Sequence, residues 1–91
     1  MKTHLLAPIQ SVAQSIAALD TLLPGQRNPW LLLAASGDPI AYFNVAEKLD
    51  GEPLPHVAAD LSGRHYDDDA PVRNILLRLQ AMVGGELSVE E

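Results

Sequence analysis

The sequence contains no cysteine, few basic residues and few aromatic residues. Without cysteine, a disulfide scaffold, a thiolate zinc site, an iron–sulfur cluster and a cysteine nucleophile are excluded. Six Lys and Arg residues stand against twelve Asp and Glu residues, which gives a formal net charge of −6. Nucleic acids and anionic membranes are bound through clustered Lys and Arg, so we expect neither as a partner.

Long apolar runs are also missing. The longest, residues 30–35, is far shorter than the roughly eighteen residues that would cross a bilayer. Pro8, Gln10 and Ser11 interrupt the segment behind Lys2, so we expect no signal peptide and predict a cytoplasmic protein. The 91 residues, 47% of them apolar, suffice for one small domain, which we assign to residues 1–91.

Apolar residues recur at helical spacing near the start of the chain. Intervals of four and three separate Leu5, Ile9, Val12, Ile16, Leu19 and Leu23. This spacing predicts a helix over residues 8–22, ended by Pro24-Gly25. Its opposite side carries Gln10, Gln14 and alanines, with Asp20 as its one charge. Small uncharged residues there permit close approach of a second surface, and a helix that simply faces solvent is the alternative.

Three strands and a second helix follow in the predicted order. Apolar runs separated by turn residues predict strands over 30–35, 40–49 and 52–62, with a tight hairpin turn at Asp50-Gly51. Pro53 and Pro55 indicate that the third strand lies at an edge, at least in its first half. A helix over 70–83 begins with Asp69 as its N-cap and ends at glycines 84 and 85, and the acidic tail 86–91 is expected to fray. The predicted fold is α+β, a three-stranded antiparallel meander with an N-terminal and a C-terminal helix in an αβββα two-layer sandwich.

A hairpin register that pairs Leu49 with Glu52 makes both faces of this sheet mostly apolar. One face then holds Trp30, Leu32, Phe43, Val45, His56 and Ala58, and the other holds Leu31, Tyr42, Val57, Ala59 and Leu61. Because an antiparallel sheet with one wet face alternates apolar and polar residues, we expect the second face to be buried against another molecule, most economically a second copy. The candidate interface residues are Gln10, Gln14, Trp30, Leu32, Phe43 and His56. The alternative is that the helices lie on opposite sides of the sheet.

The densest polar stretch, residues 60–69, leaves the last strand and enters the second helix. Its candidate ligand-binding residues are Asp60, Ser62, Arg64, His65 and Tyr66. A divalent cation held by His65, Asp67 and Asp69 is a weaker hypothesis, because the spacing matches no known metal motif. In the simpler interpretation, the aspartates complement the positive end of the helix dipole and Arg64 pairs with a neighbouring acid. No cofactor and no catalytic residue is predicted.

The sequence favours a small dimerising protein-interaction or regulatory module of the bacterial type, without catalytic activity. Two other functions remain open. One is small-molecule or divalent-metal binding through the loop from Arg64 to Asp69. The other is an acidic antitoxin-like or immunity-like inhibitor of a basic protein, which rests on the net charge alone. An enzyme is the least favoured class, because no convergent set of catalytic side chains is recognisable.

Overall fold

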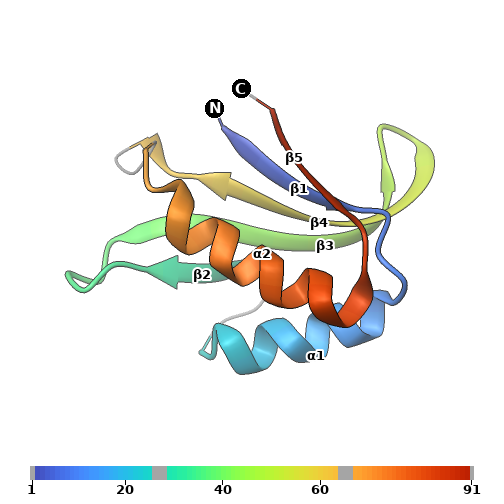
Figure 1. Ribbon diagram of the computed structural model, residues 1–91. Coiled ribbons are helices and arrows are strands. Elements are labelled where there is room, and N and C mark those ends of the chain that lie inside the picture. Colours follow the sequence, from blue (N-terminus) through green and yellow to red (C-terminus); the bar gives the residue numbers. More distant parts are fainter. Residues whose placement is uncertain (1, 26–28, 64–66, 91) are drawn as a thin grey trace.

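The computed structural model describes residues 2–25, 29–63 and 67–90. These residues form two helices and one five-stranded antiparallel sheet. The elements are β1 (Thr3–Ala7), α1 (Val12–Leu22), β2 (Trp30–Leu33), β3 (Pro39–Leu49), β4 (Glu52–Leu61), α2 (Asp69–Val83) and β5 (Glu86–Glu90). The α+β class is confirmed. The three-stranded meander with an αβββα layout is wrong, because the strands lie side by side in the order β2-β3-β4-β1-β5 (Figure 1).

The first strand that was not predicted is β1. It contains Leu5, which also fits the helical spacing of apolar residues in α1. Leu5 continues the stripe of α1, yet the helix begins only after Ser11, whose side-chain oxygen accepts the backbone N–H of Gln14 at 3.1 Å. Upstream of that cap, burial alternates along the chain, with His4 and Leu6 buried and Leu5 half-buried. This period of two is the pattern of a strand. Helix α1 is therefore four residues shorter at its start than predicted.

The second unpredicted strand, β5, is the acidic tail that was expected to fray. It pairs with β1 along its whole length, from Ala7 opposite Glu86 to Thr3 opposite Glu90. Gly84, with φ of 71°, ends helix α2 as predicted. Gly85 follows with φ of 95°, and a Cβ there would lie 3.0 Å from the backbone oxygen of Pro8. A glycine is therefore required where β5 passes close to the end of β1.

The register of β3 and β4 starts as predicted and then changes. Leu49 pairs with Glu52 across Asp50 and Gly51, which both have positive φ as a type I′ turn requires. Between Ala46 and Lys48 the pairing shifts by one residue, so that two residues of β4 face one of β3. Beyond this bulge Val45 pairs with Val57 and Phe43 with Ala59. A shift of one residue exchanges the two faces of a strand, so the predicted faces of β4 are wrong.

Strand β4 is not an edge strand, because β1 lies on its free side. The pairing with β1 covers the second half of β4, from Val57 to Asp60. Pro53 precedes that paired part, and the carbonyl oxygen of Pro55 accepts the backbone N–H of Ile9 at 2.9 Å. Both prolines thus lie where no ladder hydrogen bond to β1 is needed, which fits the prediction made for the first half of the strand.

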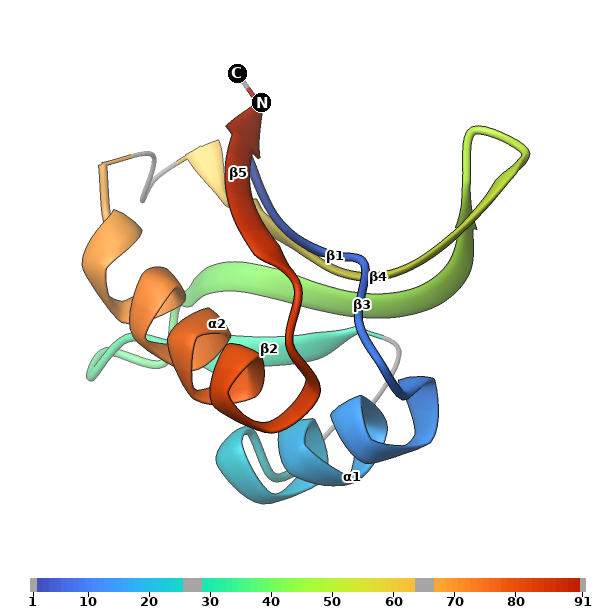
Figure 2. The same cartoon turned by 45° about the vertical axis from the view of Figure 1, so that its right-hand side comes forward.

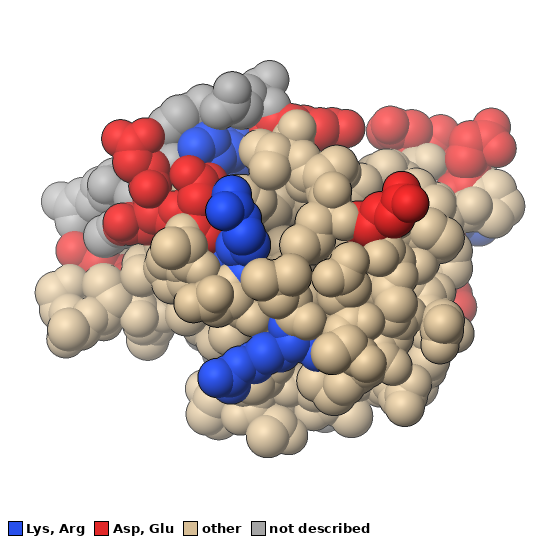
Figure 3. Space-filling model, viewed as in Figure 1, with Lys and Arg blue, Asp and Glu red and all other residues tan. Residues whose placement is uncertain are grey.

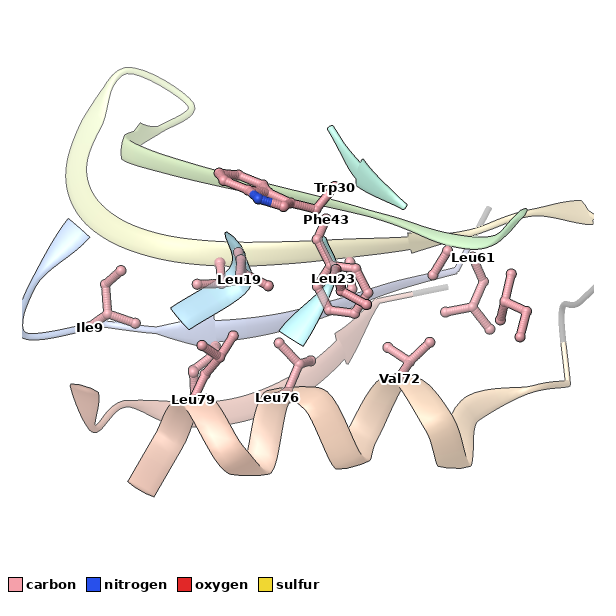
Figure 4. Packing of buried hydrophobic residues seen from close by; sticks show 14 of the residues in the cluster. Ile9, Leu19, Leu23, Trp30, Phe43, Leu61, Val72, Leu76 and Leu79 are labelled. Atoms are coloured by element: carbon pink, nitrogen blue, oxygen red, sulfur yellow. The ribbon is translucent and has the colours of Figure 1, made fainter. Parts of the chain in front are cut away.

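Helices α1 and α2 pack on the same side of the sheet, as Figures 1 and 2 show. The corrected register places the large apolar side chains on that side, where Trp30, Phe43 and Leu61 meet Leu19 of α1 and Leu76 of α2 (Figure 4). The indole Nε1–H of Trp30 donates a hydrogen bond of 2.9 Å to Asp20 of α1. Trp30 and Phe43, predicted at an interface, therefore lie in the core of the chain. Neither described helix is long and apolar enough to cross a membrane.

The opposite face of the sheet has no helix or strand of the described chain over it. We call this surface the open face. Strand pairing assigns to it Thr3, Leu5, Ala7, Leu31, Tyr42, Asn44, Ala46, Lys48, His56, Ala58, Asp60, Glu86, Ser88 and Glu90. The sheet is curved, and both the tip of the β3–β4 hairpin and the start of β1 turn away from the helices (Figure 2). The open face thus lies on the inner side of the curve.

Candidate functional site

A cluster of charged and polar side chains joins the first strand to the start of helix α2. Asp69 is the first residue of α2, and Asp68 stands in the N-cap position that was predicted for Asp69. The two carboxylate oxygens of Asp69 have different partners: Oδ2 lies 3.0 Å from Nζ of Lys2, and Oδ1 lies 2.7 Å from Nε2 of His4. Lys2 and His4 are buried, with side chains 9% and 4% exposed, whereas that of Asp69 is 28% exposed. We call these residues the Lys2–His4–Asp69 cluster.

The electrostatics of the cluster favour an ionised Asp69. A carboxylate only accepts hydrogen bonds, so Nε2 of His4 carries the proton that lies between the two groups. The hydrogen bond from His4 is the largest of the effects that lower the pKa of Asp69 below its ordinary value of 3.8, and the hydrogen bond from Lys2 is the next. The start of a helix is also the positive end of its dipole, where a negative charge is favourable.

The lowered pKa of Asp69 predicts a loss of stability in acid. The carboxylate stabilises the folded chain above about pH 4, and this contribution disappears as the pH falls through the pKa of the folded state. In urea denaturation at a series of pH values, we expect Asp69→Asn to be less stable than the unmodified chain near neutral pH. The difference should shrink as the pH falls below 3.8. Asp67→Asn, in the same loop, is the control. A difference for Asp69→Asn that stays constant across this range would contradict the prediction.

The chemistry of the cluster is that of a structural tie. A histidine held by a carboxylate resembles half of a general-base system, but such a base needs a reacting hydroxyl or water within reach. His4 is almost fully buried, so its ring is withdrawn from solvent, and its Nε2 is engaged by Asp69. The hydrogen bonds fix β1 to the start of α2. His4 and Asp69, which they join, are 65 residues apart in the chain.

The predicted loop residues are only partly brought together. Thr3 Oγ1 donates a hydrogen bond of 2.5 Å to Asp60 Oδ1 on the open face. The backbone N–H of Ser62 donates to the carbonyl of Ile40 at 2.9 Å, and Ser62 Oγ is buried without a partner among the described residues. Asp67 is exposed. The predicted roles of Arg64, His65 and Tyr66 lie outside the described residues, which hold no group of three His, Asp or Glu side chains suited to a metal ion.

Sequence reasoning missed Lys2 and His4, the partners of Asp69. Residues 2–6, Lys-Thr-His-Leu-Leu, do not alternate between polar and apolar types, so the alternating burial of this strand left no signal in the sequence. His4 pairs with Ala59 on one side and Val89 on the other, so its ring lies on the face that the helices cover. A buried histidine and lysine there require an acidic partner, and Asp69 supplies it.

The open face is the second candidate site. Its middle, on β2, β3 and β4, is built from Leu31, Tyr42, Asn44, Ala46, His56, Ala58 and Asp60. An open face in water usually carries alternate charged residues, whereas Asp60 is the one charged residue of this middle part, and Lys48 follows only at the hairpin end of β3. His56 is buried, and its Nδ1 lies 2.7 Å from the carbonyl oxygen of Leu54. Of the other predicted interface residues, Gln10 and Gln14 are exposed, and Leu32 is half-buried on the helix side.

Comparison with protein-family models, with curated proteins and with solved structures finds no match to this chain.

Proposed function

We propose that the chain is a small dimerising protein-interaction module that acts through its surface rather than through catalysis. The proposal rests on the two parts of the surface that are poor in charge. One is the middle of the open face, which stays uncovered because both helices pack on the same side of the sheet, and the other is the uncharged edge strand β2. Leu5, Leu31 and Tyr42 contribute apolar side chains to this face, and alanines lie between them. An extended surface of this kind is typical of contact with protein.

A second candidate function, the binding of a basic protein, is favoured by the acids that border the open face. Glu86 and Glu90 lie on the open face along β5. At the opposite end of the sheet, the β3–β4 hairpin carries three exposed acids, Glu47, Asp50 and Glu52. A partner with a basic surface would be attracted to this border. Such binding would weaken as the salt concentration rises, because the border is exposed to solvent.

Sedimentation equilibrium of the purified chain tests the proposed dimerisation. At concentrations of about 1 to 100 µM, which span the dissociation constants of many specific complexes, we expect a mass of twice the 9.8 kDa of one chain. A mass of one chain over the whole range would contradict the dimer. The measurement is repeated at high salt, because a chain with a net charge of −6 should associate more tightly when repulsion is screened.

A further inference from the structure

The sheet has two edges, and they differ in how they are protected. An edge strand presents unpaired backbone N–H and C=O groups, and proteins usually guard such an edge with charged side chains. Strand β5 has Glu86 and Glu90 at its two ends. Strand β2 has the sequence Trp-Leu-Leu-Leu, without a charge, and its last residue, Leu33, is 52% exposed. The β2 edge is thus apolar and uncharged, and it is guarded by its shortness and by the register shift between Leu32 and Leu33 rather than by charge.

Helix α1 lies beneath β2, so its exposed side adjoins the β2 edge. Asp20 of α1 holds the indole of Trp30 in β2, and Figures 1 and 2 show α1 on the β2 side of α2. The exposed residues of α1 are uncharged: Ala13, Gln14, Ala17 and Thr21. Ala13, Ala17 and Thr21 are spaced by four, so they form one row along the helix. We call β2 and this side of α1 the β2–α1 flank.

The charge distribution favours this flank for contact between copies. Two chains with a net charge of −6 repel each other, so a stable contact needs a surface where acids are few. Figure 3 shows acidic side chains gathered over the start of α2 and over the hairpin, whereas the surface over α1 shows none in that view. The acids closest to the flank in the chain are Asp20, which accepts the Trp30 hydrogen bond, and Asp38 in the turn after β2.

The alternative location, the open face, fits a second copy less well. It lies on the inner side of a curved sheet (Figure 2), and two inwardly curved surfaces touch only at their rims. A face-to-face dimer would also bring Asp60, Glu86 and Glu90 of the two copies toward one another, and like charges at an interface are costly.

We infer that a second copy of the chain binds at the β2–α1 flank, with β2 paired antiparallel to β2 of the other copy and the two α1 helices in contact. An antiparallel strand edge is self-complementary under a two-fold axis, the commonest symmetry of protein dimers. A four-residue edge is small beside the roughly 800 Å² per partner of a standard interface, so the α1 contact is a necessary part. The small side chains of Ala13 and Ala17 allow the helices to approach closely. This inference rests on the proposed dimerisation and specifies its surface.

Matched variants locate the contact by sedimentation equilibrium. We test Leu33→Lys on the β2 edge and Ala17→Glu on α1. In each variant dimer, the two copies bring like charges together at the contact, and we expect the dissociation constant to rise at least about tenfold. Val89→Lys makes the same kind of change on the β5 edge, where Val89 is 48% exposed. Ala81→Glu makes it at an exposed position of α2. Both controls should leave the dissociation constant within about threefold of the unmodified chain.

Ala58→Glu on the open face separates the two locations. If it abolishes the dimer while both flank variants leave it intact, the second copy covers the open face, and the inference is wrong although the proposed dimerisation stands. If the unmodified chain is monomeric throughout, both fail. Circular dichroism of each variant checks that it is folded. Ala17→Glu, at an exposed helical position, provides the decisive test if Leu33→Lys disturbs the β2–β3 pairing.

Discussion

Replacing Leu76 by alanine is expected to lower the free energy of unfolding by about 2–5 kcal/mol, whereas the same change at Leu77 should cost less than about 1 kcal/mol. Leu76 is fully buried on the side of α2 that faces the sheet (Figure 4). Leu77 is 44% exposed. Truncating Leu76 removes its apolar contacts and leaves a cavity. At Leu77 little buried surface is lost, and alanine is a good helix former.

Urea denaturation followed by circular dichroism measures both changes, and the shared helix makes the pair well matched. A chain of 91 residues has a total stability of about 5–10 kcal/mol at most, so the Leu76 variant should be partly unfolded at mildly elevated temperature. Equal losses for the two variants would contradict the orientation of α2 against the sheet.

Replacing Ala59 by glutamate is expected to prevent folding, with a loss of more than about 4 kcal/mol, whereas Ala58→Glu should cost less than about 1 kcal/mol. Ala59 is fully buried beneath the helices, opposite Phe43 on β3 and His4 on β1. A glutamate there would be cut off from water in a packed core, and the neighbouring His4 is already hydrogen-bonded to Asp69. Ala58 lies on the open face, half-buried, where the longer side chain can reach solvent.

This pair tests the bulge in β4 directly. A register without the extra residue would put Ala58 beneath the helices and Ala59 on the open face, so it predicts the opposite order of the two losses. Soluble yield and the two unfolding curves decide between the registers. A folded Ala59→Glu variant together with an unfolded Ala58→Glu variant would contradict the fold described above.

Features determined by neighbouring residues could be predicted from the sequence. Helix α2 ends at Val83 before Gly84, and the Asp50-Gly51 turn has the backbone conformation that its residues favour. The positions of β2, β3 and β4 were correct within two residues at each end. These elements depend on caps, turn residues and local periodicity, all of which are visible in a short stretch of chain.

Features that depend on distant pairing could not be predicted. Leu5 satisfies both the helical stripe of α1 and the alternation of β1, and pairing with β4 and β5 decides between them. The polar segment Glu86–Glu90 becomes a strand because β1 offers it an edge. The Lys2–His4–Asp69 cluster likewise joins residues from opposite ends of the chain. Tertiary contacts override local preference in each case.

Intermolecular nuclear Overhauser effects between labelled and unlabelled copies would test the central claim, self-association at the β2–α1 flank, most directly. In an equimolar mixture of ¹³C-labelled and unlabelled chain, we predict contacts from the methyl groups of Ala13, Ala17 and Leu33 to protons of the other copy. Contacts from Leu5 and Ala58 instead would move the second copy to the open face. Absence of any intermolecular contact at concentrations where the chain stays folded would contradict the dimer itself.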